Sequence, residues 1–234
     1  MPKQKLFWMY LVVLHLLLAL LVTRTDAYQM LLGYFGVPPA EGGEYQRNML
    51  AFQLRQQPFI QKNSVHLLGD SHIQGLYLND FCPKAVNLGI GGDTTSGILA
   101  RLPYYSSIQS ASAVVLLIGY NDLPYRSNIK IIEQYQQVLA QLAPRTKKLL
   151  VAIPPPASTF TNFEAAQRVQ QLNVELKKLA EGSSQLEFIA GTWQTLPVEA
   201  ADKLLLTDGI HLAESGYDVL RSQLRQALAK ECHE

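Results

Sequence analysis

Short apolar runs alternate with amphipathic stretches along most of the chain. Five runs are rich in Val, Leu and Ile, and they span 64–68, 85–88, 113–118, 148–153 and 186–190. Their length and composition are typical of buried parallel strands. Apolar residues at helical spacing predict helices over 44–57, 129–142, 163–180 and 213–229. This alternation predicts an α/β domain, a flavodoxin-like three-layer α/β/α sandwich with a five-stranded parallel sheet.

The beginning of the chain has a different pattern. Lys3 and Lys5 precede an apolar run over residues 6–22, interrupted only by His15, whose length lies between that of a signal-peptide core and that of a membrane span. We favour an N-terminal hydrophobic helix that acts as an uncleaved signal anchor within residues 1–27. Cleavage after Ala27 is the alternative, and it would release a secreted protein. The basic residues before the run predict a domain outside the cytoplasm.

The rest of the chain is predicted to form a linker and one domain. Residues 28–43 are rich in Gly and Pro, as linkers often are, and residues 44–234 are enough for a single core. The formal net charge is +1 without a long basic run, so we expect no nucleic-acid partner. Cys82 and Cys232 do not have the spacing of a zinc site. They could pair in an oxidising compartment, or remain as one half-buried and one exposed thiol.

Four polar segments lie where a parallel sheet usually places its site, at strand ends and in a late loop. They are Gly-Asp-Ser at 69–71, the Gly-rich segment 87–95, Gly-Tyr-Asn-Asp at 119–122 and Asp-Gly-Ile-His at 208–211. Ser71 follows a strand and opens a helical segment, whose N-terminus favours developing negative charge. An ordinary N-cap serine would look the same.

His211 is the best candidate for a base among the five histidines. Asp208, three residues earlier, can accept a hydrogen bond from the imidazole and fix its tautomer. The alternative is an aspartate that caps a turn beside a surface histidine. The other histidines have other expected places: His15 in the apolar run, His66 inside a strand, His72 pointing away from Ser71, and His233 in the tail.

Donors for an oxyanion are available in the other two segments. Backbone N–H groups of the Gly-rich segment and the side-chain amide of Asn121 could stabilise negative charge, although a Gly-rich turn and a turn asparagine would have the same composition. The Gly-rich segment lacks the third glycine of a dinucleotide-binding motif. The chain also lacks the GxSxG nucleophile elbow and the HExxH zinc motif.

In this order, the four segments resemble the four signature blocks of the SGNH (GDSL) hydrolase superfamily. The resemblance implies that Ser71 is the nucleophile, Asp208 the acid and His211 the base. It also implies an oxyanion hole formed by the backbone N–H groups of Ser71 and Gly92 and by the side chain of Asn121. No metal and no organic cofactor are implied.

Finer resemblances concern single segments. Segment 87–95 resembles the catalytic subunits of intracellular platelet-activating-factor acetylhydrolases. Segment 208–211 resembles bacterial periplasmic thioesterase/lysophospholipases, and this resemblance implies a bacterial periplasm as the location of the domain. One residue departs from the GDSL pattern: His72 occupies the position where the motif usually has Leu.

The implied activity is hydrolysis of carboxylic esters or thioesters through an acyl-enzyme, with a small acyl ester or a lysolipid as substrate. Two alternatives stay open. One is an O-acyltransferase or deacylase of cell-envelope polysaccharide that uses the same triad, and the other is a tethered binding module with a vestigial site. Tyr120, residues 154–156, Phe160 and Leu212 are candidates for an acyl pocket, or they serve only to pack the loops.

Overall fold

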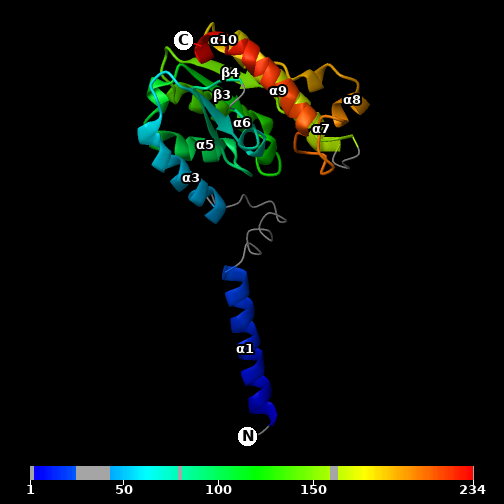
Figure 1. Ribbon diagram of the computed structural model, residues 1–234. Coiled ribbons are helices and arrows are strands. Elements are labelled where there is room, and N and C mark those ends of the chain that lie inside the picture. The colour runs from blue at the N-terminus through cyan, green and yellow to red at the C-terminus, as the bar shows by residue number, and fades with distance from the viewer. Residues whose placement is uncertain (1–2, 25–42, 79–80, 159–162, 234) are drawn as a thin grey trace. The chain divides into compact units, whose positions relative to one another are not determined.

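The computed structural model describes residues 3–24, 43–78, 81–158 and 163–233 (Figure 1). The chain forms two units, Met1–Gly43 and Glu44–Glu234. Helix α1 (Lys3–Arg24) lies in the first unit. Within the described ranges, no helix combines the length and the apolarity needed to cross a membrane. Apart from Gly43, the predicted linker lies outside the described residues.

A five-stranded parallel sheet forms the centre of the second unit, as predicted. The strand order is β2-β1-β3-β4-β5. The strands are β1 (Val65–Gly69), β2 (Ala85–Gly89), β3 (Ala113–Leu117), β4 (Lys147–Val151) and β5 (Leu186–Ile189). Every residue of β1 and β3 is buried, which requires cover on both faces of the sheet. The predicted three-layer arrangement follows from this burial.

Eight helices of the described domain surround the sheet (Figure 1). They are α3 (Glu44–Gln56), α4 (Ser71–Gln74), α5 (Thr95–Arg101), α6 (Asn128–Gln141), α7 (Phe163–Glu181), α8 (Val198–Asp202), α9 (Glu214–Ala227) and α10 (Ala229–His233). Helices α3, α6, α7 and α9 correspond to the predicted ones. The predicted last helix is interrupted, because α9 ends at Ala227 and α10 begins separately at Ala229.

Helix α6 shows why amphipathic spacing located the long helices correctly. Its buried residues Ile131, Gln134, Tyr135 and Val138 recur at intervals of three and four, which places them on one face. The helix begins after Ser127, whose side chain accepts a hydrogen bond from the Lys130 N–H, so the first turn is capped. The sequence pattern and the local capping therefore agree.

His66 lies inside β1, as predicted, and is fully buried. Its Nε2 atom lies 2.7 Å from the Ser107 hydroxyl. Burial lowers the pKa of His66 to about 4, partly offset by the Ser64 carbonyl. The histidine is therefore neutral at physiological pH and belongs to the core.

Acidification is expected to destabilise the domain through His66. The unfolded chain takes up a proton near pH 6.5, whereas the folded chain does so only at about pH 4, so stability falls as the pH is lowered between these values. The loss attributable to His66 should be about 2 kcal/mol between pH 7 and pH 5. Urea unfolding of the wild type and of His66→Leu at both pH values measures it. Equal pH dependence in the two proteins would contradict the prediction.

Cys82 and Cys232 form a disulfide, with their Cα atoms 5.0 Å apart. Both side chains are buried in the core. The structure thus favours the paired state over one half-buried and one exposed thiol. Cys232 is not an exposed thiol, because α10 carries it onto the core.

Removal of the disulfide is expected to destabilise the domain strongly. The bond joins residues separated by 150 positions, and closing so long a loop restricts the unfolded chain considerably. The double variant Cys82→Ser/Cys232→Ser should lose about 3–5 kcal/mol of unfolding free energy. Denaturant unfolding measures this loss, and reduced wild type serves as the matched control. A loss below about 1 kcal/mol would show that the bond adds little to a domain already held by its core.

Candidate active site

Three predicted site residues from distant parts of the chain meet beyond the carboxyl end of β1. Ser71 is the first residue of α4, directly after this strand. Asp208 and His211 lie in the loop between α8 and α9. His211 Nε2 lies 3.0 Å from Ser71 Oγ, and His211 Nδ1 lies 2.7 Å from Asp208 Oδ2. The hydroxyl, imidazole and carboxylate therefore form one continuous hydrogen-bonded row.

The loop that carries Asp208 and His211 fixes the orientation of both side chains. Asp208 Oδ1 accepts hydrogen bonds from the backbone N–H groups of Ile210 and His211, at 2.9 and 3.0 Å. Gly209 has a φ of 69°, which suits a glycine in this tight turn. The hydrogen bond from the His211 ring and that from the Ile210 N–H lower the pKa of Asp208 to about 2. An ionised carboxylate favours the proton on Nδ1 and leaves Nε2 free to accept one.

The three predicted oxyanion donors line one cavity of about 380 Å³, together with His211. The Ser71 N–H belongs to the first turn of α4, where N–H groups have no partner in their own helix. Gly92 has a φ of 72°, so a side chain at this position would be strained. Asn121 Nδ2 donates to the Asp93 carbonyl at 3.0 Å and lies 3.5 Å from Asp70 Oδ2. The contact with Asp93 orients the amide. The longer contact with Asp70 holds the second N–H only weakly, so that this N–H can donate to an oxyanion.

A buried arginine, which sequence reasoning missed, fixes the Gly-rich turn. Arg101 is only 5% exposed, and its Nε donates to Asp93 Oδ2 at 2.8 Å. Its other nitrogens donate to the carbonyls of Leu88 and Gly69, at the ends of β2 and β1. Burial raises the pKa of Asp93, and the charge of Arg101 opposes this. The ion pair therefore connects the turn that carries Gly92 to both strand ends.

A second buried carboxylate holds the loop that carries Asn121. Asp122 is fully buried and accepts hydrogen bonds from the Thr95 backbone N–H, at 2.9 Å, and from the Thr95 hydroxyl, at 2.7 Å. Arg126 Nη1 lies 3.2 Å from Asp122 Oδ1. Burial raises the pKa of Asp122 to about 6. Since Thr95 begins α5, this contact fastens that helix to the end of β3, beside the site.

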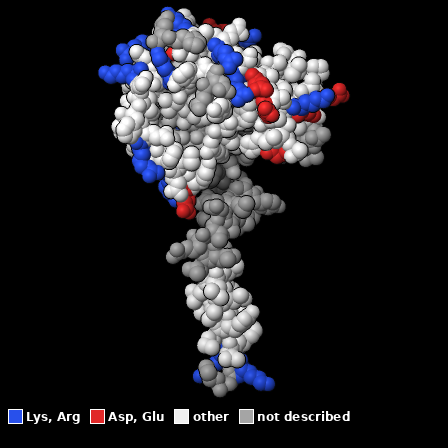
Figure 2. Space-filling view, viewed as in Figure 1, with Lys and Arg blue, Asp and Glu red and all other residues white. Residues whose placement is uncertain are grey.

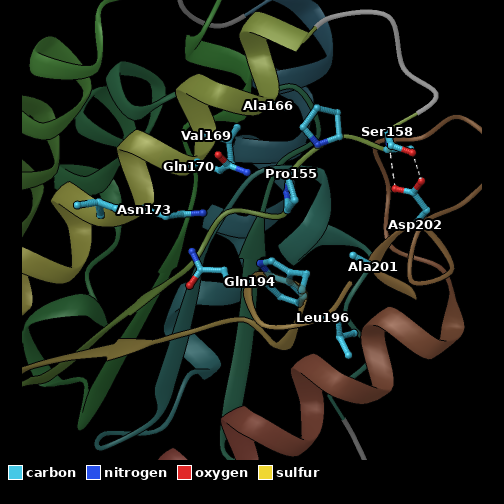
Figure 3. A pocket seen from close by; sticks show the side chains of 14 residues that line it. Pro155, Ser158, Ala166, Val169, Gln170, Asn173, Gln194, Leu196, Ala201 and Asp202 are labelled. Atoms are coloured by element: carbon cyan, nitrogen blue, oxygen red, sulfur yellow. Dashed lines mark hydrogen bonds between the residues drawn. The ribbon is translucent and has the colours of Figure 1, made fainter. Parts of the chain in front are cut away.

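A second cavity, of about 680 Å³, lies between α7 and the segments that follow β4 and β5 (Figure 3). Much of its wall is apolar, and Figure 3 shows Pro155, Val169 and Leu196 around it. At its rim the Ser158 N–H donates to Asp202 Oδ1 at 3.0 Å. This cavity and the one at Ser71 share none of the residues that line them.

The residues predicted to shape an acyl pocket do not gather in one place. Tyr120 lines the cavity at Ser71, whereas Pro155 and Pro156 line the second cavity. Leu212 is buried in the core, where it lines a small void with Pro154 and Pro155. Phe160 lies outside the described residues. Among the residues that the structure describes, no cluster of three His, Cys, Asp or Glu side chains could hold a metal ion.

Comparison with known proteins identifies the family. Residues 67–219 match the model of the GDSL-like Lipase/Acylhydrolase family. Among curated protein sequences no match to the chain was found.

Solved structures show the fold of the domain. A GDSL-like lipase from Bacteroides thetaiotaomicron shares 22% identity, with a TM-score of 0.66 over 77% of this chain and 97% of that one. A Streptococcus pneumonia protein, provisionally named a platelet activating factor, shares 23% identity, with a TM-score of 0.68 over 87% and 99% of the two chains. An acetylxylan esterase from Geobacillus stearothermophilus shares 17% identity, with a TM-score of 0.56 over 74% and 95%. With its family match and this fold, the chain belongs to the GDSL-like lipase/acylhydrolase family and is an ester hydrolase.

Proposed function

We propose that the protein hydrolyses carboxylic esters or thioesters through an acyl-enzyme on Ser71. One observation carries this proposal: the row in which His211 contacts Ser71 at 3.0 Å and Asp208 at 2.7 Å. A nucleophile, a base and a group that orients the base are the three parts that covalent acyl transfer requires. Ser71 and His211 are 140 positions apart in the sequence. A capping serine or a local turn would therefore not explain why their side chains are in contact.

Each residue has a defined role in the proposed reaction. His211 Nε2 takes the hydroxyl proton as Ser71 Oγ bonds to the acyl carbon. The backbone N–H groups of Ser71 and Gly92 and the Asn121 amide stabilise the oxyanion. His211 then gives the proton to the departing alcohol or thiol as its bond to the acyl carbon breaks. A water molecule, deprotonated by His211, then attacks the acyl carbon of the acyl-enzyme, and the carboxylic acid is released as Ser71 regains its proton. Asp208 stabilises the imidazolium in both steps.

A small acyl ester or a lysolipid is the substrate class we propose. The cavity at Ser71 is modest, about 380 Å³, and Asp208 and His211 are 46% and 42% exposed. A shallow, open site suits a short acyl group or a single-chain lipid better than a bulky triglyceride.

An O-acyltransferase or a deacylase of cell-envelope polysaccharide is the second candidate. The fold is shared with an acetylxylan esterase, and the open site leaves room for a sugar chain. The preference of the acyl-enzyme for water or for a sugar hydroxyl separates hydrolysis from transfer. A binding module with a vestigial site is less consistent with the intact row from Ser71 to Asp208.

A p-nitrophenyl ester series from acetate to palmitate tests the proposed function. Hydrolysis by the purified full-length protein, blocked by a serine-directed fluorophosphonate that labels Ser71, is the expected result. The chain-length optimum separates a short-acyl esterase from a lysolipid enzyme. Labelling without hydrolysis, with acyl transfer to added oligosaccharide, would favour the transferase. If the folded protein shows neither labelling nor hydrolysis, the binding module is the interpretation that remains.

We also propose that the domain works outside the cytoplasm, in a bacterial periplasm. Its buried disulfide, Cys82–Cys232, is a bond that persists in oxidising compartments. Lys3 and Lys5 before the apolar run of residues 6–22 fit a signal anchor with its domain exported. Alkaline carbonate extraction of cell membranes distinguishes an anchored protein from a released one, and an alkaline phosphatase fusion reports export. An inactive fusion would contradict this location.

A further inference from the structure

A buried ion pair that the proposed mechanism does not use lies directly beside the nucleophile. His72 and Asp70 flank Ser71, and each side chain is only 2% exposed. His72 Nδ1 lies 3.1 Å from Asp70 Oδ1, and the same oxygen accepts the His72 backbone N–H at 3.0 Å. The ring of His72 thus turns away from Ser71 and into the protein.

The second ring nitrogen of His72 contacts the loop that carries Asp208 and His211. His72 Nε2 lies 3.1 Å from the backbone carbonyl of Ile210. Ile210 immediately precedes His211, and its own N–H donates to Asp208. The imidazole therefore bridges the turn after β1 to a loop 138 residues later in the sequence.

The partners of His72 determine which protons the ring must carry. A carbonyl oxygen and an ionised carboxylate can accept hydrogen bonds but cannot donate them. Both ring nitrogens must therefore donate if Asp70 is ionised and both contacts are made. A neutral imidazole would turn one unprotonated ring nitrogen towards an acceptor oxygen, so that this buried nitrogen would have no donor, which is costly.

The charges around His72 favour its protonated form. Burial lowers the pKa of His72, but the hydrogen bond and the charge of Asp70 outweigh it, with smaller contributions from the Ile210 carbonyl and Asp208, so the pKa is raised overall. The His211 ring faces it with centroids 5.9 Å apart. On α9, Tyr217 has its pKa raised to about 12 by burial, so it stays neutral beside Asp70.

Asp70 extends this contact to the oxyanion hole. Its second oxygen lies 3.5 Å from Asn121 Nδ2, and Asn121 in turn donates to the Asp93 carbonyl beside Gly92. Asn121, Asp70, His72 and Ile210 thus form a second row of contacts beside the catalytic one. This row links the segments that carry the nucleophile, an oxyanion donor and the base.

We propose that His72 is a charged imidazolium at pH 7 that positions the loop of Asp208 and His211 against Ser71. It is a positioning residue, because it acts through Ile210 and Asp70 and does not reach the reacting atoms. Its position is the one at which this chain departs from the GDSL motif, where Leu is usual and could form neither hydrogen bond. The kinetic part of this inference rests on the proposed function, whereas the protonation state does not.

Histidine side-chain ¹⁵N NMR of the full-length protein at pH 7 tests the charge directly. His72 should show two protonated ring nitrogens, with its signals assigned by their loss in His72→Gln. His66 is the matched control in the same spectrum, because it is equally buried but its pKa is lowered to about 4, so one of its nitrogens should be unprotonated. An unprotonated Nδ1 or Nε2 on His72 would overturn the proposal.

The rate of reaction at Ser71 tests the positioning role. His72→Leu should lower kcat and the rate of fluorophosphonate labelling by about 10- to 100-fold, with KM within about twofold, because small displacements of the base are costly. His66→Leu should leave both rates unchanged, although it removes a buried histidine of the same strand–turn unit. Wild-type rates in folded His72→Leu would refute positioning. A wild type without esterase activity would refute the proposed function, while the NMR result would still decide the charge of His72.

Discussion

Ser71→Ala is expected to lower kcat for ester hydrolysis by about 10⁴- to 10⁶-fold, the range seen when a triad nucleophile is removed. The substitution removes one oxygen from a half-buried position at the start of α4, so the fold should be unaffected. The remaining rate would come from the oxyanion donors and from substrate binding alone. Initial rates on the best p-nitrophenyl ester, at matched protein concentration, measure the change.

A matched serine variant shows whether this loss is specific. Ser184 is exposed in the turn between α7 and β5, and Ser184→Ala should retain wild-type activity. Circular dichroism should show the same melting curve for the wild type and for both variants. A Ser71→Ala protein that keeps near-wild-type kcat would rule out the acyl-enzyme, and another nucleophile or an activated water would then be required.

Asp208→Asn is expected to lower kcat by about 10⁴-fold, as loss of the orienting carboxylate does in serine hydrolases. Asp208 Oδ2 lies 2.7 Å from His211 Nδ1 and keeps the ring proton there. An amide NH₂ facing Nδ1 would instead move the proton to Nε2, which could then no longer accept the hydroxyl proton of Ser71. The pKa of Asp208 is lowered to about 2, so the wild-type carboxylate should stay ionised throughout the working pH range.

The second aspartate comparison uses a surface residue. Asp218 on α9 is 60% exposed and pairs with Arg221, and Asp218→Asn should leave kcat unchanged, since surface pairs contribute little. Rates at pH 6 to 10 show whether Asp208→Asn recovers when the solvent becomes basic enough to replace a misdirected base. If Asp208→Asn turns over within about tenfold of the wild type, Asp208 does not orient His211 as proposed.

The sheet and the long helices could be predicted because burial imposes simple patterns on them. A strand covered on both faces must be apolar throughout, and β1 and β3 are. Helix α5 was missed because it is short and contains Gly97, a residue that disfavours helices. The glycine is needed there, since a Cβ atom would lie 1.9 Å from Asp93 Oδ1. Close packing against another segment overrides local helix propensity at this position.

The sequence predicted the catalytic residues of the candidate site but not the residues that hold them in place. Ser71, Asp208 and His211 each stand in a recognisable motif, and motif order was enough to associate them. Arg101 has no such motif, because its carbonyl and carboxylate partners lie on other segments. The direction of the His72 ring was predicted, as it points away from Ser71, but its contacts were not. An aspartate two residues before a buried histidine is the local signal, and the Ile210 carbonyl can be found only in three dimensions.

The disulfide would keep the two halves of the domain together if a protease cleaved the chain between them. Cys82 lies on the Ser71 side of the exposed turn at 182–185, and Cys232 lies on the His211 side. A protease that cleaves this turn would therefore produce a two-chain molecule held by one covalent bond, with the nucleophile on one chain and the base on the other. Reduction would let the chains separate when unfolded, so recovery of activity after denaturation should depend on the bond being intact in the nicked form.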